Sequence, residues 1–258
     1  MTRSEALTTH IPPTNKTTMH YGIIAAGEGS RLVQEGVTKP KPLVDLDGRP
    51  MVERLIGIFT QCGAESVSVI VNEQMTEVRS FLEGLALRLP VPLTLVVRST
   101  PSSMHSFYEL SRLMEGKGRF VLTTVDTIFR PEDFRRYVEA YAAAPARVDA
   151  MMALTSYIDD EKPLYVDCDP EMRITAFRDS ADGRDRYVSG GIYGLSDRCI
   201  AVLRRCIETG VSRMRNYQRA LLTDGLDVRG FDMGKIIDVD HAGDIETTRR
   251  FIAGSPLK

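Results

Sequence analysis

Residues 21–44 read YGIIAAGEGSRLVQEGVTKPKPLV and form the most informative stretch of this chain. The apolar residues 23–26 predict a buried strand that opens into a glycine-rich loop at 27–32, whose backbone N–H groups could bind phosphate. Arg31 belongs to that loop, and Lys41 follows between two prolines that restrict the backbone around it. The stretch therefore predicts a phosphate-binding loop with two fixed positive charges.

Two common phosphate-binding motifs do not match this stretch. The dinucleotide-binding fingerprint requires a third glycine where this chain has Leu32. The P-loop requires Gly-Lys followed by Ser or Thr at the start of a helix, and no such tripeptide occurs in the sequence. The loop therefore belongs to neither of these two classes.

A different signature agrees at several spaced positions. It consists of G-x-G-[ST]-R-[LM], a short spacer, P-K-P-L or P-K-V-L, and then Gly-x-Pro before a helix, here at 48–51. The chain thereby resembles the nucleotidyltransferases that make nucleotide-activated sugars and phospho-alcohols. This resemblance implies that Arg31 and Lys41 act in catalysis. It also implies that the nucleotide is bound at the end of the first strand and in the loop, by Ala25, Ala26, Gly27, Gly29 and Ser30.

Strand and helix patterns alternate through the first half of the chain. Apolar and β-branched runs predict strands at 21–25, 66–71, 93–97 and 120–125. Helical spacing of apolar residues predicts helices at 51–61, 76–88, 104–114 and 131–144. This order favours a parallel sheet with helices on both faces.

After residue 150 the rhythm changes to short strands without long helices between them. The predicted strands are 150–155, 164–168, 174–177 and 191–195, followed by helices at 197–209 and 213–222, a strand pair at 228–231 and 235–239, and a last helix at 245–252. We therefore predict an α/β fold, a Rossmann-like three-layer αβα sandwich with a mixed, mostly parallel sheet. It would form one domain over 19–258, with a nucleotide-binding half at about 19–149 and an acceptor-binding half at about 150–258.

Two aspartates are candidates for holding a metal ion. Asp126 ends the strand at 120–125, where ligands bind in open α/β sheets, although a turn or helix cap would explain it equally well. The resemblance implies that Asp126 and Asp240 are the ligands of Mg²⁺. Asp238 shares one strand face with Asp240 and is the weaker alternative, and Asp244 is expected to serve the N-terminus of the last helix.

Two further segments are candidates for recognising the substrates. Ser102 and Ser103 stand where related enzymes read the nucleobase, although Ser103 would also serve as a helix N-cap. Gly190 and Gly191 match a strand that lines the acceptor in the family, and a bulged strand would explain them too. A lysine of many sugar-specific relatives is missing near Arg178, so the acceptor is not identified.

Composition excludes several other classes of protein. The 258 residues are 43% hydrophobic and 26% charged with a net charge of −2, which predicts a large core and no attraction to nucleic acid or membrane. We expect no membrane span, no secretory signal and four reduced cysteines, hence a cytoplasmic protein. Residues 1–18 are polar and aperiodic, which predicts a flexible arm or sequence upstream of a start at Met19.

The resemblance implies a Mg²⁺-dependent transfer of a nucleoside monophosphate. A nucleoside triphosphate would give its nucleotidyl group to a sugar 1-phosphate or phospho-alcohol and release pyrophosphate. The base, the acceptor and the assembly into a homo-oligomer are left open. The alternatives are a molybdenum-cofactor guanylyltransferase, which shares the opening motif, and a nucleotide-binding sensor without catalysis.

Overall fold

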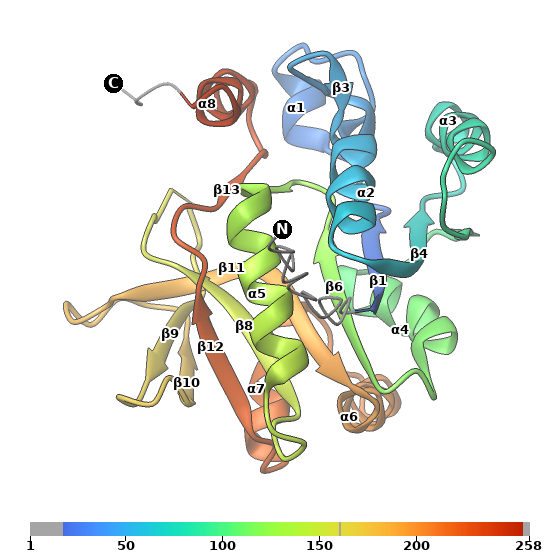
Figure 1. Ribbon diagram of the computed structural model, residues 1–258. Coiled ribbons are helices and arrows are strands. Elements are labelled where there is room, and N and C mark those ends of the chain that lie inside the picture. The colour runs from blue at the N-terminus through green and yellow to red at the C-terminus, as the bar shows by residue number, and fades with distance from the viewer. Residues whose placement is uncertain (1–17, 160, 255–258) are drawn as a thin grey trace, which may run out of the picture.

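The computed structural model describes residues 18–159 and 161–254. Within that part of the chain, one large sheet is built from β1 (Met19–Ala25), β4 (Ala64–Val71), β5 (Leu93–Val97), β6 (Arg119–Thr124), β8 (Ala150–Thr155), β9 (Tyr165–Cys168), β10 (Ile174–Arg178), β11 (Tyr187–Ser196) and β12 (Val228–Asp232). The main strand order is β10-β9-β11-β6-β1-β4-β5, with β8 beside β11 and β12 beside β8 (Figure 1). The predicted arm at 1–18 lies, apart from Thr18, outside the described residues.

The sheet is mixed, as the sequence predicts. β5, β4, β1 and β6 are mutually parallel. β11 then runs antiparallel to β6 and continues the sheet into the second half of the chain. A bulge interrupts the pairing of β11 with β8 between Ser189 and Tyr193. The predicted change of rhythm after residue 150 is thus the change from parallel to antiparallel pairing.

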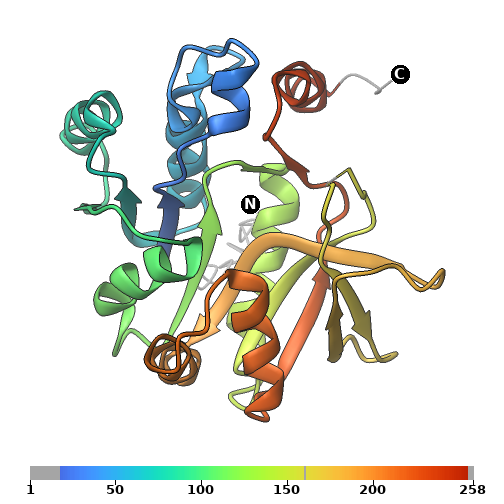
Figure 2. The same ribbon diagram turned by 180° about the vertical axis from the view of Figure 1, so that it is seen from behind.

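Helices cover both faces of the sheet, which confirms the predicted three-layer α/β fold. One face carries α2 (Met51–Gln61), α3 (Thr76–Ala86) and α5 (Pro131–Ala143). The opposite face, seen in Figure 2, carries α4 (Ser103–Met114), α6 (Asp197–Glu208) and α7 (Met214–Thr223). In the described part of the chain, no helix is both long enough and apolar enough to cross a membrane.

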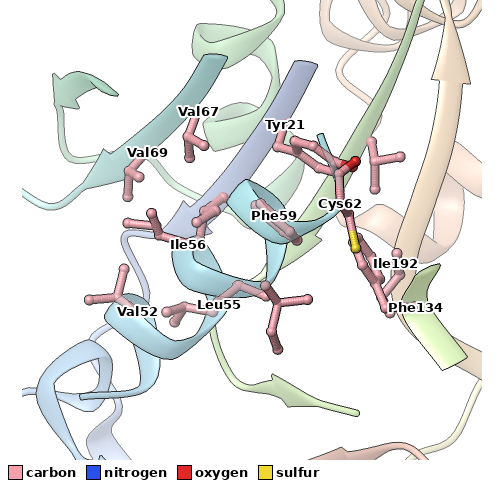
Figure 3. Close-up of a cluster of buried hydrophobic side chains, with 14 of the residues drawn as sticks. Tyr21, Val52, Leu55, Ile56, Phe59, Cys62, Val67, Val69, Phe134 and Ile192 are labelled. Atoms are coloured by element: carbon pink, nitrogen blue, oxygen red, sulfur yellow. The ribbon is translucent and has the colours of Figure 1, made fainter. Parts of the chain in front are cut away.

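The core beneath α2 shows how the sequence pattern becomes packing (Figure 3). Phe59 and its helical neighbours face β1 and β4, because apolar residues recur every three to four positions along α2. The Phe59 ring stacks on that of Tyr21 with centroids 4.3 Å apart and on that of Phe134 at 5.2 Å. Burial of each such side chain stabilises the fold by about 1.5–3 kcal/mol.

The remaining elements, which are short except for α8, gather at one end of the sheet. They are α1 (Ser30–Gln34), the 3₁₀ turn η1 (Lys41–Leu43), β2 (Asp45–Leu46), β3 (Arg49–Pro50), β7 (Thr127–Ile128), β13 (Ile237–Asp238) and α8 (Ala242–Ile252). A small separate core joins them, formed by Leu32, Val44, Leu46, Met51, Ile128, Ile237, Val239 and Phe251. This core fixes the segments that border the candidate site.

Two expectations need correction, and some short elements were not predicted. The strands at 228–231 and 235–239 do not pair with each other, because β12 runs parallel to β8 while β13 pairs with β7. The last helix begins at Ala242 rather than 245, since His241 and Asp244 form a capping box there. The short helix α1 and the β2–β3 hairpin were not predicted, because five- and two-residue elements are too short for a periodic pattern.

Candidate functional site

The candidate site lies at the topological switch point of the sheet, where successive strands are added on opposite sides of β1. β1 is flanked by β4 on one side and β6 on the other, both parallel to it. The loops that follow β1 and β6 therefore leave the same edge of the sheet side by side, which is where open α/β sheets bind ligands. A cleft of about 530 Å³ opens there.

Most of the predicted site residues line this one cleft. They are Ala26, Gly27, Gly29, Ser30, Arg31, Lys41, Ser102, Ser103, Asp126 and Asp240. Ala25 is the exception among the nucleotide-binding candidates, since it is the last residue of β1 and is buried in the sheet. The structure thus brings together residues from five separate segments of the chain.

Gly29 holds the glycine-rich loop against Lys41. Its φ of +62° lies in the left-handed region, and a Cβ at this position would stand 2.9 Å from the Cβ of Lys41. Only glycine tolerates both the conformation and the close approach. Lys41 begins η1, and its side chain is only 9% exposed. The glycine therefore allows the loop and the buried lysine to form one wall of the cleft.

The ammonium group of Lys41 lies between the two predicted metal ligands. Its Nζ is 2.5 Å from Asp126 Oδ2 and 2.6 Å from Asp240 Oδ1. Arg31 reaches the other oxygen of Asp240, with Nη1 2.7 Å from Oδ2. Burial lowers the pKa of Lys41, but the two carboxylates outweigh burial and raise it above the ordinary value. Burial raises the pKa of Asp240, and Lys41 and Arg31 together hold it below its usual value.

A two-strand pairing brings these carboxylates together. Asp126 stands between β6 and β7, and Asp240 is the second residue after β13. β7 and β13 pair antiparallel, and the Val239 N–H donates to the Asp126 carbonyl at 3.1 Å. Asp244 caps the start of α8, as predicted, by accepting bonds from the backbone N–H groups of Asp240 and His241 at 2.9 and 2.7 Å.

The two carboxylates fit the predicted magnesium ion. Asp126 and Asp240 converge on one positive group, and carboxylate oxygens are the donors that Mg²⁺ prefers. No set of three His, Cys, Asp or Glu side chains surrounds a common point among residues 18–159 and 161–254. A site with two protein carboxylates is typical of Mg²⁺ that also binds phosphate oxygens and water. Asp238, the weaker alternative, instead lies 3.4 Å from Thr127 Oγ1.

The predicted base-binding loop borders the cleft at the start of α4. Ser102, rather than Ser103, is the N-cap residue, and its Oγ bonds His105 Nδ1 at 2.8 Å. Asn72, at the end of β4, also lines the cleft and was not predicted. Its Oδ1 accepts bonds from Gln74 N–H and Ser99 Oγ, both at 3.0 Å, which fixes the orientation of the amide. Its position after a predicted strand was the available signal.

A second, smaller cavity of about 70 Å³ adjoins the cleft and shares Arg31 and Asp240 with it. Gly190 lines this cavity, as expected for the acceptor side. Gly191 has a φ of +72°, and a Cβ there would stand 2.6 Å from Thr127 Oγ1. The structure therefore places Gly191 against β7 as part of the bulge and outside the lining of the cavity.

The smaller cavity is rich in carboxylates. Its lining includes Tyr157, Asp159, Glu161, Asp238, His241 and Asp244. The first three and His241 were not predicted, and the segment that holds the first three has no motif. Arg178 does not face the cavity lining but pairs with Asp167 and Asp185, each at 2.8 Å. Two arginines of α7 also have partners outside the cavity, since Arg215 and Arg219 both pair with Asp179.

His241 joins the small cavity to α1. Its Nδ1 lies 2.6 Å from Glu35 Oε1, and its Nε2 lies 3.7 Å from Glu161. The hydrogen bond from His241, with a second from the Ala242 N–H, holds the pKa of Glu35 below its usual value. Conversely, the bond to Glu35 raises the pKa of His241.

Two curated proteins resemble parts of this chain. The CMP-5′-(3-aminopropyl)phosphonate synthase of Streptomyces rubellomurinus is 29% identical over 156 residues, which cover 54% of this chain and 24% of that protein. The 2-aminoethylphosphonate cytidylyltransferase of Lancefieldella rimae is 42% identical over 50 residues, which cover 19% of this chain and 20% of that protein. The chain thus matches about a quarter or less of the length of these relatives.

A solved structure has the same fold. The inositol-1-phosphate CTP transferase from T. maritima superposes with a TM-score of 0.75 at 18% identity, covering 93% of this chain and 99% of that one. Residues 22–219 match the family described as the MobA-like NTP transferase domain, and this match spans the glycine-rich loop, Lys41, Asp126 and the small cavity's strand β11. The chain therefore belongs to the MobA-like NTP transferase family.

Proposed function

We propose that this protein transfers a nucleoside monophosphate from a nucleoside triphosphate to a phosphate- or phosphonate-bearing small molecule. The observation that carries the proposal is the group of Arg31, Lys41, Asp126 and Asp240, placed where a nucleotide-sized cleft meets a second cavity. An acceptor oxygen would attack the α-phosphorus, a new P–O bond would form, and the bond to pyrophosphate would break. The acceptor is already anionic, so the reaction needs no strong general base.

The residues of the cleft would stabilise the negative charge of this reaction. Arg31 and the backbone N–H groups of 27–30 would bind the triphosphate and the leaving pyrophosphate. Lys41 would contact the α-phosphate or the incoming acceptor. Asp126 and Asp240 would hold Mg²⁺, which when bound neutralises phosphate oxygens and aligns them. Because phosphoryl chemistry depends on positioning and charge, this set of residues suffices.

We propose CTP as the donor and an acceptor that carries an ammonium group. Two relatives are named as enzymes of aminoalkylphosphonate cytidylyl chemistry. The small cavity supports the same choice, since Asp159 and Glu161 line it next to the aromatic ring of Tyr157. Carboxylates attract an ammonium group, whereas a neutral sugar hydroxyl would gain no charge attraction from them.

The two alternatives are distinguished by what they require. A molybdenum-cofactor guanylyltransferase would use GTP and a large anionic acceptor, which the acidic lining of the small cavity disfavours. A sensor would bind nucleotide without releasing pyrophosphate, and it would not need Lys41 between two carboxylates at the junction of the two cavities.

A pyrophosphate-release assay tests the proposal. The protein is incubated with Mg²⁺, each of CTP, UTP, dTTP and GTP, and either 2-aminoethylphosphonate or phosphate-bearing alcohols and sugars. We expect release with CTP that depends on the aminoalkylphosphonate, and a cytidylylated product seen by ³¹P NMR. Nucleotide binding without release under any combination would establish the sensor instead, and activity confined to GTP would establish a guanylyltransferase.

A further inference from the structure

Glu35 connects two segments that are distant in the sequence. It directly follows α1, and its Oε1 lies 2.6 Å from Nδ1 of His241, 206 residues away. Its Oε2 accepts a hydrogen bond from the Ala242 N–H, also at 2.6 Å. Ala242 is the first residue of α8, whose leading N–H groups have no partner within the helix. A carboxylate is therefore favoured here by hydrogen bonding and by the helix dipole.

Arg31 and Glu35 act from the same side of α1. They are four residues apart, which places them on one face of a helix. Arg31 binds Asp240, and Glu35 binds His241 and Ala242, so one helix face contacts three consecutive residues. α1 and α8 lie side by side at one end of the sheet in both views (Figures 1 and 2).

The Arg31–Asp240 pair and the contacts of Glu35 differ in whether they can persist during the proposed reaction. Arg31 and Asp240 pair with each other in this structure, and each has a further partner in the proposed function, phosphate for Arg31 and a metal ion for Asp240. Their pair must therefore weaken when substrates bind. The contacts of Glu35 include neither Lys41 nor the carboxylates of Asp126 and Asp240, so they can persist throughout.

We propose that Glu35 is a positioning residue, which keeps Asp240 opposite Lys41 and Asp126 by fixing the start of α8 to α1. The inference rests on the proposed transfer reaction. Glu35 lines neither cavity. It acts on the junction of the two cavities, which Arg31 and Asp240 form. Loss of Glu35 would leave every charged group of the junction present, but Asp240 would no longer be held in a fixed position opposite Lys41 and Asp126.

Glu35→Ala tests this role with two independent measurements. We expect kcat for cytidylyl transfer to fall about 10–100-fold, the range found when a group that orients a metal ligand is removed. The KM for CTP should change little, because the lost precision matters most in the transition state. Hydrogen exchange at the Ala242 amide should become faster, since its acceptor is gone. Glu35→Gln, which can still accept that bond, should restore most of both properties.

Glu246→Ala is the matched control. Glu246 is an exposed glutamate on α8 itself, and it pairs with Arg250 one turn later rather than with α1. This variant should leave kcat and the Ala242 exchange rate near their original values. Equal kcat in the two alanine variants would overturn the proposal, even if exchange at Ala242 increased. Unchanged exchange in Glu35→Ala would overturn it as well.

Failure of the proposed function can be told apart from failure of this inference. If the unaltered protein transfers no nucleotide to any acceptor, the proposed function fails. Hydrogen exchange at the Ala242 amide then decides the role of Glu35, because this measurement needs no turnover. Faster exchange in Glu35→Ala than in Glu246→Ala would support positioning, and equal exchange would end it.

Discussion

Lys41 donates a hydrogen bond to Asp240 at 2.6 Å, although 199 residues separate them in the chain. The same ammonium lies 2.5 Å from Asp126, so a lysine stands where the two carboxylates could otherwise share a metal ion. Mg²⁺ would replace Lys41 as the partner of the carboxylates, and phosphate would replace the carboxylates as the partner of Lys41. Each of these binding events would therefore favour the other. The predictions below follow from this arrangement and from its surroundings.

Removal of the buried ammonium should affect catalysis more than folding. Lys41→Ala is expected to lower kcat about 10²–10³-fold, as for loss of one preorganised charge-stabilising group. It leaves two facing carboxylates without their shared partner, so the melting temperature should fall in EDTA and recover with Mg²⁺. The stability loss should be smaller than the ~3–5 kcal/mol of fully buried pairs, since Asp240 is 39% exposed.

Lys39→Ala is the control for that measurement. Lys39 lies two residues earlier and pairs with Glu77, but both side chains are more than half exposed. Exposed pairs contribute about 0–1 kcal/mol, so its variant should keep both activity and stability. Near-normal turnover of Lys41→Ala would remove Lys41 from the mechanism.

The two aspartates should behave as one unit toward Mg²⁺. Asp126→Asn and Asp240→Asn are each expected to raise the Mg²⁺ concentration needed for half-maximal turnover. The double variant should be little worse than either single one, because residues that act together are not additive. Titration of turnover against Mg²⁺ checks this, with Asp179→Asn, whose partners are Arg215 and Arg219, as the control. Additive losses would show that the two carboxylates bind different groups.

Gly191 should be needed because its backbone lies close to Thr127 as well as because its φ is positive. In Gly191→Ala, the new Cβ would stand 2.6 Å from Thr127 Oγ1 at a φ of +72°. Gly183→Ala is the matched control, because its φ is +81° but no atom lies within 4 Å of its Cβ. Both variants lose about 1–3 kcal/mol to backbone strain. Urea unfolding should show an additional loss in Gly191→Ala, and equal losses would mean that β7 adapts freely.

The carboxylates of the small cavity should select the acceptor. Glu161→Gln and Asp159→Asn are each expected to raise the KM for an ammonium-bearing acceptor by up to about 5-fold, because both side chains are exposed and exposed charge pairs contribute about 0–1 kcal/mol. The KM for an alkylphosphonate of the same length without the amine should not change, because it makes no charge contact there. Steady-state kinetics with both acceptors checks this. A parallel rise for both acceptors would point to a disrupted cavity.

Local chemistry made part of the site predictable. Gly29 and the prolines around Lys41 act through their own backbone preferences, so their effect can be predicted from a short segment of sequence. The apolar period of β1 and α2 likewise follows from burial of one face. The place of Asp126 at this edge was predictable because parallel strands have their carboxyl ends at one edge of the sheet, whereas its role as a metal ligand was implied by the family resemblance.

The pairing of β13 was not predictable in the same way. Two neighbouring strand patterns near the C-terminus suggested a hairpin, but β12 joins β8 and β13 joins β7. A two-residue strand has almost no periodic signal, and its partner is chosen by the small core around Ile128 and Ile237. The contact of Asp240 with Lys41 depends on that choice.

The amino-acid sequence is therefore sufficient to predict the α/β class and the glycine-rich loop, since these depend on short-range backbone preferences and on periodic burial, whereas the roles of the site residues were implied by the family resemblance. The convergence of Lys41, Asp126 and Asp240, the contact of Gly191 with Thr127 and the bond from Glu35 to α8 required the folded chain. Each joins segments far apart in sequence, and their distances depend on strand register and side-chain packing that no local pattern encodes.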